Sequence, residues 1–385
     1  MVAAVRRGES QRAVARCFGV SLHTVQRWVE RVTGKRLDRV DWSDRPTGPV
    51  QASTRTSPKM EALILQTRQE LRQESDLGEF GAVAVRRALG QRGVGKLPSI
   101  RTIGRVFDRR GQLDGRQRPR RKAPPPGWYL PEVVAGQAEL DQVDTVEGLK
   151  LKDGPLVEGI NAVSLHGGLV ASWPQAAAVT ARAVQKALIA HWRSWGLPGY
   201  VQFDNDTLFQ GPHHLPDVIG RVMRLCLSLG VVPVFAPPRE TGFQAAIENY
   251  NGQWQAKVWS RFEHSSLGAL QERSARYVSA HHRRTASRRE AAPLREAFPK
   301  GWQLDLQTHP QGQLIFIRRT NPQGEVTLLG HTFPVDPQWT GRLVRCEVLL
   351  NKGGIRFFQL RRRDPQEQPL LNEVIYHLPK RPFHE

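Results

Sequence analysis

The chain has 385 residues, with 56 Lys and Arg against 36 Asp and Glu, which gives a formal net charge of +20 at pH 7. This length is too great for one ordinary hydrophobic core, so we expect several domains. A positive excess of this size favours a polyanionic partner, nucleic acid first, because each neutralised phosphate releases counterions.

Other features of the sequence argue against other classes of protein. No apolar run approaches the roughly 18–20 residues that a membrane-spanning helix needs, so we expect no membrane partner. Arg6 and Arg7 interrupt the start of the chain, which argues against a signal peptide and favours a cytoplasmic protein. The three cysteines are odd in number and far apart, which argues against a disulfide framework and a structural zinc site.

Residues 10–32 are predicted to form two short helices joined by a tight turn. Ser10 and Ser21 suit the two helix starts, and Gly19 suits the turn. The pattern resembles a helix-turn-helix, with a second helix at 22–31 that enters the major groove of DNA, whereas an ordinary helical hairpin is the alternative. We expect a DNA-binding domain over residues 1–45. Its shared core is predicted to contain Val14, Phe18, Val25, Trp28 and Val29, and its candidate DNA contacts are His23, Thr24, Gln26 and Arg27.

A second helix-turn-helix DNA-binding domain is predicted over residues 58–110. Helical periods run through 59–75 and around 82–90, and Ser99 suits the start of a recognition helix at 100–109. The residues on that helix predicted to contact DNA are Arg101, Thr102 and Arg105.

Residues 111–130 are predicted to form a basic, proline-rich linker. Its proline-rich end is stiff and extended, and its basic part is suited to lie along a phosphate backbone, although a solvated spacer is the alternative. The candidate phosphate contacts in this segment are Arg118, Arg120, Arg121 and Lys122.

Residues 131–290 show the pattern of an α/β domain. Turns at 152–155 and 166–168 separate the first three strands, which suggests antiparallel hairpins, and the later alternation of helix and strand implies parallel crossover units. We therefore expect a mixed five-stranded sheet flanked by helices. The strands are predicted near 138–146, 156–164, 168–175, 199–203 and 231–235, with helices at 180–195 and 216–229.

Several carboxylates in this domain lie at predicted strand ends or in a predicted helix, where they could serve as metal ligands. Asp204 ends an apolar strand, Glu248 lies in a segment of helical period, and an upstream strand offers Asp141 and Asp144. Strand-end aspartates with a helical glutamate, in a strongly basic chain, are typical of a magnesium-dependent enzyme that acts on nucleic-acid phosphates.

From residue 312 the apolar period changes to two, and Gly and Pro turns separate the runs. This pattern predicts a small β-barrel domain over residues 310–380. The barrel is expected either to contact DNA or other subunits, or to have no such role.

Three segments together resemble the catalytic core of insertion-sequence transposases in the retroviral-integrase superfamily. They are Gln142-Val143-Asp144-Thr145, Phe203-Asp204-Asn205 and Ala245-Ala246-Ile247-Glu248-Asn249-Tyr250-Asn251-Gly252. The resemblance implies an RNase H-like fold and a DDE triad of Asp144, Asp204 and Glu248. It also implies that these residues are both catalytic and metal ligands, holding Mg²⁺ or Mn²⁺, two ions per site.

Two positions of the triad have competitors. Asp141 lies in the same strand as Asp144 and would point to the opposite face of a regular strand; the Gln-aliphatic-Asp pattern of the family favours Asp144. Glu240 has the family's usual spacing from Asp204 but lies in a predicted loop, whereas Glu248 lies in the helical segment. The chain departs from the family by having Asp206 where a glycine is common, and this carboxylate either caps the following turn or alters metal occupancy.

The resemblance implies a transposase that binds the ends of a mobile DNA element, nicks them and joins the 3′-hydroxyl ends to target DNA. Its partners would be transposon-end DNA and target DNA, with the protein acting as a homo-oligomer on DNA in a bacterial, nucleoid-associated setting. The alternatives are a catalytically inactive or domesticated DNA-binding regulator, and a nuclease of the same fold that cuts without joining.

Overall fold

The computed structural model describes residues 1–44, 56–113, 126–152, 154–212, 215–240 and 242–383. The chain divides into two compact units, Met1–Glu61 and Ala62–Glu385. Among the described residues, no helix has both the length and the apolar character needed to cross a membrane.

The first unit contains a small helical domain. The Ser10 and Ser21 hydroxyls accept hydrogen bonds from the N–H groups of Ala13 and Thr24, so both serines cap their helices as predicted. Val14 and Val25 are fully buried in its core, but Phe18 is 53% exposed, so its predicted place in the core was wrong. The helices are α1 (Val2–Arg6), α2 (Gln11–Cys17), α3 (Leu22–Arg31) and the short 3-10 helix η1 (Leu37–Arg39).

Three further helices follow at the predicted positions. The Ser99 hydroxyl accepts a hydrogen bond from the Thr102 N–H and caps the third of them. Ile103 and Val106 on this last helix are fully buried. The helices are α4 (Pro58–Glu74), α5 (Ala82–Gln91) and α6 (Ile100–Arg109).

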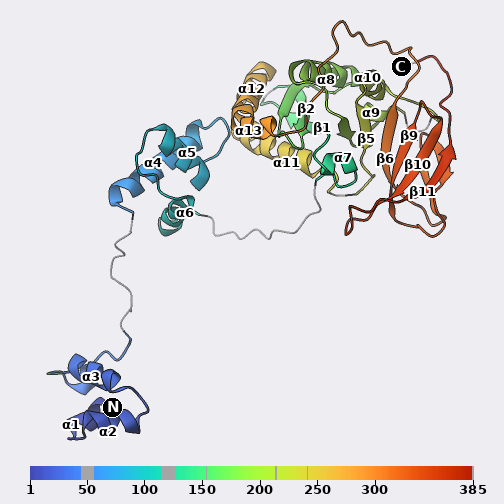
Figure 1. The fold of residues 1–385 in the computed structure, drawn as a ribbon. Coiled ribbons are helices and arrows are strands. Elements are labelled where there is room, and N and C mark those ends of the chain that lie inside the picture. The colour runs from blue at the N-terminus through green and yellow to red at the C-terminus, as the bar shows by residue number, and fades with distance from the viewer. Residues whose placement is uncertain (45–55, 114–125, 153, 213–214, 241, 384–385) are drawn as a thin grey trace. The chain divides into compact units, whose positions relative to one another are not determined.

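A nine-stranded mixed sheet forms the centre of the second unit (Figure 1). The five strands predicted for the core are all present: β1, β2 and β3 are antiparallel, whereas β4 and β5 run parallel to β1. In spatial order the strands are β11 (Leu370–Ile375), β10 (Gly354–Gln359), β9 (Leu343–Leu349), β6 (Gln313–Arg319), β5 (Val232–Phe235), β4 (Tyr200–Phe203), β1 (Leu140–Lys150), β2 (Leu156–Ser164) and β3 (Val170–Ala176).

The C-terminal strands extend this sheet, and the predicted separate β-barrel is not confirmed. Strand β6 pairs in parallel with β5, with Phe235 opposite Phe316 and their rings stacked 5.1 Å apart. This pairing satisfies backbone groups that β5 would otherwise expose at a sheet edge. Strands β9, β10 and β11 then add antiparallel, as Figure 1 shows in red. Strands β7 (Glu325–Leu328) and β8 (His331–Pro334) form a separate hairpin.

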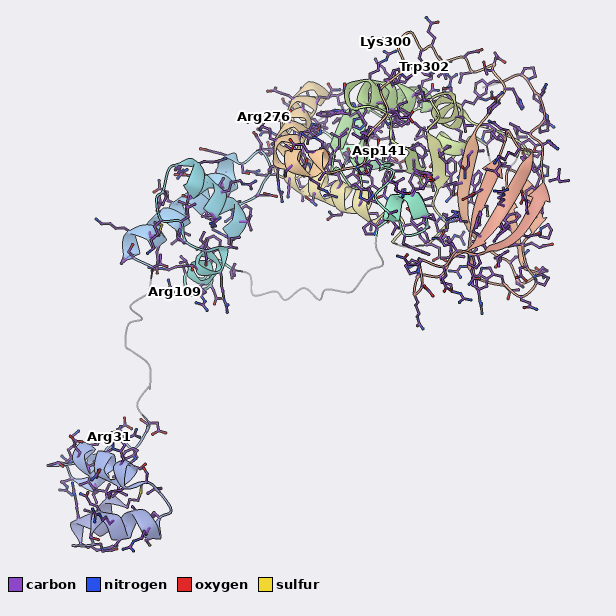
Figure 2. All side chains as sticks on the ribbon, viewed as in Figure 1. Arg31, Arg109, Asp141, Arg276, Lys300 and Trp302 are labelled. Carbon is purple, nitrogen blue, oxygen red and sulfur yellow. The ribbon has the colours of Figure 1, made fainter. Side chains whose placement is uncertain are left out.

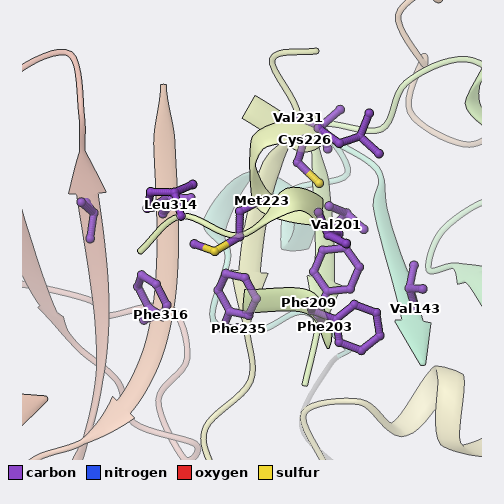
Figure 3. Packing of buried hydrophobic residues seen from close by; sticks show 14 of the residues in the cluster. Val143, Val201, Phe203, Phe209, Met223, Cys226, Val231, Phe235, Leu314 and Phe316 are labelled. Atoms are coloured by element: carbon purple, nitrogen blue, oxygen red, sulfur yellow. The ribbon is translucent and has the colours of Figure 1, made fainter. Parts of the chain in front are cut away.

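Helices cover both faces of the sheet. The first face packs under α8 (Ala181–Trp195) and α10 (Arg221–Ser228), where Val143, Phe203 and Phe235 join one hydrophobic cluster (Figure 3). On the second face, α11 (Ala245–Trp254) and α12 (Leu267–Arg284) pack against β1, β2 and β3. The remaining helices are α7 (Pro131–Val134), α9 (Thr207–Gln210), the π-helical turn η2 (Gln255–Trp259) and α13 (Ala286–Glu290).

The predicted linker ends earlier than expected. Trp128, Tyr129 and Leu130 are at most 2% exposed and pack with Phe243 and Leu140 in a cluster on the second face. Large apolar side chains at the end of a proline-rich segment are therefore part of the core, because they cover the sheet beside α11.

Candidate active site

Strand β1 presents its two candidate aspartates to opposite faces of the sheet. Side chains alternate along a strand, so residues three positions apart point in opposite directions. Val143 belongs to the hydrophobic cluster on the first face, and Asp141, two positions away on the strand, shares that face. Asp144 therefore lies on the second face, where α11 packs.

Asp141 is a buried structural residue, 1% exposed, inside the core (Figure 2). Its oxygens accept hydrogen bonds from the Arg295 guanidinium at 2.9 and 2.6 Å, from the Ser164 hydroxyl at 2.6 Å and from the Trp192 indole at 3.2 Å. Burial alone would raise the pKa of Asp141, but the charge and hydrogen bonds of Arg295 outweigh this effect and hold the pKa at about 2. These contacts use both of its oxygens.

Asp144 lies among other carboxylates. The pKa of Asp144 is raised to about 6, mainly by burial and also by the nearby negative charges of Asp204 and Glu248, against the opposing hydrogen bonds from Thr145 and Asn251. The Thr145 N–H donates to Asp144 Oδ1 at 2.9 Å, and Asn251 Nδ2 donates to Oδ2 at 2.8 Å. The fold thus brings Asp204 and Glu248, which are far from Asp144 in the sequence, close enough for their charges to act on it.

The register of the parallel strands β1 and β4 explains the position of Asp204. Gln142 and Gln202 are paired across these strands, and each stands two positions before an aspartate. Asp144 and Asp204 therefore follow the pair on the same face of the sheet.

The extra carboxylate after Asp204 serves as a helix cap. Asp206 Oδ1 accepts a hydrogen bond of 2.7 Å from the Leu208 N–H at the start of α9. The Asp206 N–H in turn donates to Asp204 Oδ1 at 3.0 Å. Asp206, which stands where a glycine is common in the family that the sequence resembles, therefore has a local structural role.

Glu248 lies in the first turn of α11, and its side chain is exposed. Ile247, Tyr250 and Trp254 on the same helix are buried against the sheet, which sets the orientation of the helix. An acidic residue in the first turn also interacts favourably with the helix dipole.

Its competitor Glu240 lies in the loop that follows β5 and has other partners. Glu240 Oε1 accepts a hydrogen bond of 2.8 Å from Arg319 Nε, and Oε2 accepts one of 3.1 Å from Arg362. The glutamate whose charge acts on Asp144 is Glu248, so Glu240 serves as an anchor between this loop and the C-terminal strands.

Asn251 is a site residue that the sequence pattern did not single out. It stands three positions after Glu248, so both side chains can lie on one side of α11. It joins Asp144 to Asn161, whose Nδ2 donates to Asn251 Oδ1 at 2.8 Å and which pairs with Asp144 across β1 and β2. The three-residue spacing from Glu248 is the signal that could have identified it.

The chemistry of these side chains suits a divalent cation. Carboxylate oxygens are the hard ligands that Mg²⁺ and Mn²⁺ prefer. Besides burial, the negative charges of Asp204 and Glu248 raise the pKa of Asp144, and a bound cation would offset those charges. In the part of the chain that the structure describes, no three His, Cys, Asp or Glu side chains are already arranged to hold a metal ion. The site thus has the donors and the charge for a cation, while both Asp144 oxygens accept hydrogen bonds.

The candidate DNA contacts of the N-terminal helices lie as expected on the surface. His23, Gln26 and Arg27 on α3 are exposed, as are Arg101 and Arg105 on α6.

Thr24 and Thr102 occupy equivalent places on the two helices and are partly buried. Their hydroxyls bond to the cap residues Ser21 and Ser99 at 2.8 and 2.9 Å, so they help to form the helix starts. The linker residues Arg118, Arg120, Arg121 and Lys122 lie outside the described residues.

Comparisons with known proteins found a family match for the N-terminal helices and solved structures similar to the chain. Residues 1–40 match the family described as a homeodomain-like domain, so the chain begins with a helix-turn-helix of that type. No curated protein matches the chain.

Solved structures similar to the chain include three integrase structures. The catalytic core domain of BIV integrase is 18% identical, with 37% of this chain and 81% of that chain covered and a TM-score of 0.28. The simian T-cell lymphotropic virus intasome, in complex with PP2A regulatory subunit B56 gamma, is 15% identical, with coverages of 70% and 87% and a TM-score of 0.32. The HTLV-2 integrase catalytic core domain, in complex with magnesium and in dimeric form, is 15% identical, with coverages of 37% and 83% and a TM-score of 0.27.

Proposed function

We propose that the chain is a DDE transposase, which binds the ends of a mobile DNA element, nicks them and joins the freed 3′-hydroxyl ends to target DNA. The observation that carries this proposal is that Asp144, Asp204 and Glu248 come from two parallel strands and the helix beside them, so that the charges of Asp204 and Glu248 act on Asp144. A homeodomain-like domain at residues 1–40 of a strongly basic chain supports DNA as the partner.

Both chemical steps are displacements at phosphorus. In nicking, a water oxygen forms a bond to the phosphorus and the bond to the 3′-oxygen breaks, which leaves a 3′-hydroxyl. In joining, that hydroxyl attacks a phosphorus of the target, and the target's own 3′-oxygen leaves. Each attacking group releases its proton to solvent, and each leaving oxygen takes one up. No covalent intermediate with the protein is required.

Asp144, Asp204 and Glu248 would hold the Mg²⁺ or Mn²⁺ ions in this proposal. When bound, a pair of such ions activates the attacking oxygen and stabilises the leaving oxygen of an in-line displacement. Asn251 would hold the Asp144 carboxylate in place, as its hydrogen bond of 2.8 Å suggests. Asp141 would take no part in the chemistry, because its oxygens are committed to Arg295, Ser164 and Trp192.

The two helix-turn-helix segments would bind the ends of the element. Helices α3 and α6 would each enter a major groove, and their exposed arginines, Arg27, Arg101 and Arg105, would contact bases and phosphates. The basic residues that follow α6 in the sequence, Arg118, Arg120, Arg121 and Lys122, would contact the phosphate backbone. Cutting and joining both ends of one element calls for at least two copies, so the protein would act as a homo-oligomer on DNA.

A strand-transfer assay tests this function. The wild-type protein, Asp204→Asn and Glu248→Gln are each incubated with Mg²⁺ and an oligonucleotide that carries the element's end. Joined products that are lost in both variants support a transposase. Cleavage without joining would indicate a nuclease, and DNA binding with neither reaction a regulator. Asp141→Asn is unsuited as a control here because it disturbs the core, whereas Glu240→Gln is a suitable one, since that residue lies in the neighbouring loop with arginine partners.

A further inference from the structure

The helix that carries Glu248 obtains its cap from a neighbouring strand. Gln244 occupies the N-cap position of α11 and makes no side-chain hydrogen bond to the helix. The N–H of Ile247, the residue before Glu248, donates instead to Gln142 Oε1 at 3.1 Å. Gln142 therefore supplies the acceptor that a helix start ordinarily takes from its own N-cap side chain.

The other end of the Gln142 amide is also occupied. Gln142 Nε2 donates to the Phe243 carbonyl, just before α11, at 3.0 Å and to Gln202 Oε1 at 2.7 Å. Gln142 is 2% exposed and Gln202 is fully buried. Only an amide suits this position, because it both accepts from Ile247 and donates to the other two groups.

Tyr129 adds a second donor to the same carbonyl and amide oxygens. Its hydroxyl lies 2.6 Å from Gln202 Oε1 and 3.1 Å from the Phe243 carbonyl oxygen. Burial raises the pKa of the Tyr129 phenol, so the hydroxyl keeps its proton and acts as a donor. We call Gln142, Gln202 and Tyr129 the amide network.

The amide network contacts each catalytic element close to its carboxylate. Gln142 lies two positions before Asp144 on β1, and Gln202 lies two positions before Asp204 on β4. Ile247 directly precedes Glu248 on α11. Each glutamine shares the second face of the sheet with the aspartate two positions after it. A displacement of the Gln142 amide would therefore move the start of α11 relative to both aspartates.

We propose that Gln142 is a positioning residue, which sets Glu248 relative to Asp144 and Asp204 through the cap of α11. This role rests on the proposed function, because it matters for catalysis only if these carboxylates act together on a divalent cation. Groups that orient the ligands of a metal commonly change its affinity by about 10- to 100-fold when they are removed.

The test compares Gln142→Met and Gln142→Asn with Gln185→Met and Gln185→Asn. Gln185 is a matched control: it is 5% exposed, and its amide donates to the Arg221 carbonyl at 3.0 Å on the opposite face of the sheet. The asparagine variants retain an amide but shorten its reach, so they provide a second measurement if a methionine variant does not fold. The first readout is hydrogen exchange of the Ile247 amide in the full chain, normalised to global stability. The second is Mg²⁺ affinity by calorimetry.

We expect both Gln142 variants to speed exchange at Ile247 and to weaken Mg²⁺ binding by about tenfold or more. The Gln185 variants should change neither by more than about twofold. Equal effects in the two sets would mean that Gln142 only fills the core, and this would overturn the proposal. Both readouts are taken without DNA. A wild-type protein that binds Mg²⁺ and joins no DNA would therefore overturn the proposed function alone.

Discussion

The Arg295 guanidinium makes a two-pronged ion pair with the Asp141 carboxylate, with N–O distances of 2.9 and 2.6 Å. Arg295 follows the last helices of the core, so this contact joins a distant part of the chain to the first strand. Its side chain is 13% exposed and that of Asp141 is 1% exposed. Because water reaches neither charged group to any large extent, the pair keeps this geometry.

Arg295→Met should destabilise the protein by about 3–5 kcal/mol, because it leaves the Asp141 carboxylate buried without its counter-charge. Urea unfolding followed by tryptophan fluorescence measures this change, since Trp128, Trp192 and Trp254 are buried in the sheet domain. The control is Arg356→Met, which removes an exposed pair with Glu373 and should cost less than about 1 kcal/mol. Equal losses in the two variants would contradict a structural role for the buried pair.

The stability difference between wild type and Arg295→Met should depend on pH. Because the folded-state pKa of Asp141 is about 2, below its usual 3.8, the ion pair contributes fully above about pH 4. This contribution is lost as the pH falls toward 2 and the carboxylate takes up a proton. Unfolding curves at pH 6 and pH 2.5 should therefore show a smaller difference at the lower pH. A difference that stays constant would argue against Asp141 as the group involved.

Asp144→Asn should stabilise the metal-free protein at pH 7. The folded-state pKa of Asp144 is raised from 3.8 to about 6, so its charged form opposes folding above pH 6, and this penalty disappears as the pH falls toward 4. Each pKa unit corresponds to about 1.4 kcal/mol, and since the side chain is partly exposed we expect a gain of about 1–3 kcal/mol. Urea unfolding in the presence of a chelator measures it. A loss of stability at pH 7 would contradict a raised folded-state pKa for Asp144.

Asp206→Ala should destabilise the start of α9 by about 1 kcal/mol, because it removes the acceptor for the Leu208 N–H. Asp206→Ser keeps a capping oxygen and should lose only a few tenths of a kcal/mol. Mg²⁺ affinity, measured by calorimetry, should stay the same in both variants. Weaker Mg²⁺ binding in Asp206→Ser would instead assign this carboxylate to the metal site.

Arg27→Ala should flatten the salt dependence of DNA binding. If Arg27 neutralises one phosphate, the slope of log K against log salt concentration should decrease in magnitude by about 0.9. Fluorescence anisotropy with end-containing DNA at several salt concentrations measures this slope. Arg7→Ala is the control, since Arg7 is exposed in the same domain but lies outside α3. An unchanged slope in Arg27→Ala would place that side chain away from the backbone.

Most helices and strands could be predicted from the sequence because their signals are local. Ser21 and Ser99 cap α3 and α6 at the predicted residues, and the turns between β1, β2 and β3 lie where Gly and Pro indicated them. Phe18 was placed wrongly because helical spacing does not reveal which face of a short helix packs against its neighbours.

The partners of the C-terminal strands could not be predicted. An apolar period of two identifies a strand such as β6, but such a strand can pair with any free sheet edge. The sequence does not show that β5 offers the edge with which β6 pairs. In the same way, the burial of Trp128 and Tyr129 depends on Gln202 and Phe243, which follow far along the chain.

The sequence by itself determined that Asp204 follows an apolar strand and that Glu248 lies in a helix. It also determined that Asp141 and Asp144 face opposite sides of a regular strand. Only the tertiary structure decided that α11 covers the face of Asp144, that Arg295 neutralises Asp141, and that Glu240 is held by arginines. The reason is physical: side-chain parity and helix capping depend on neighbours within a few residues, whereas the field around a carboxylate depends on charges that the fold brings together from distant segments.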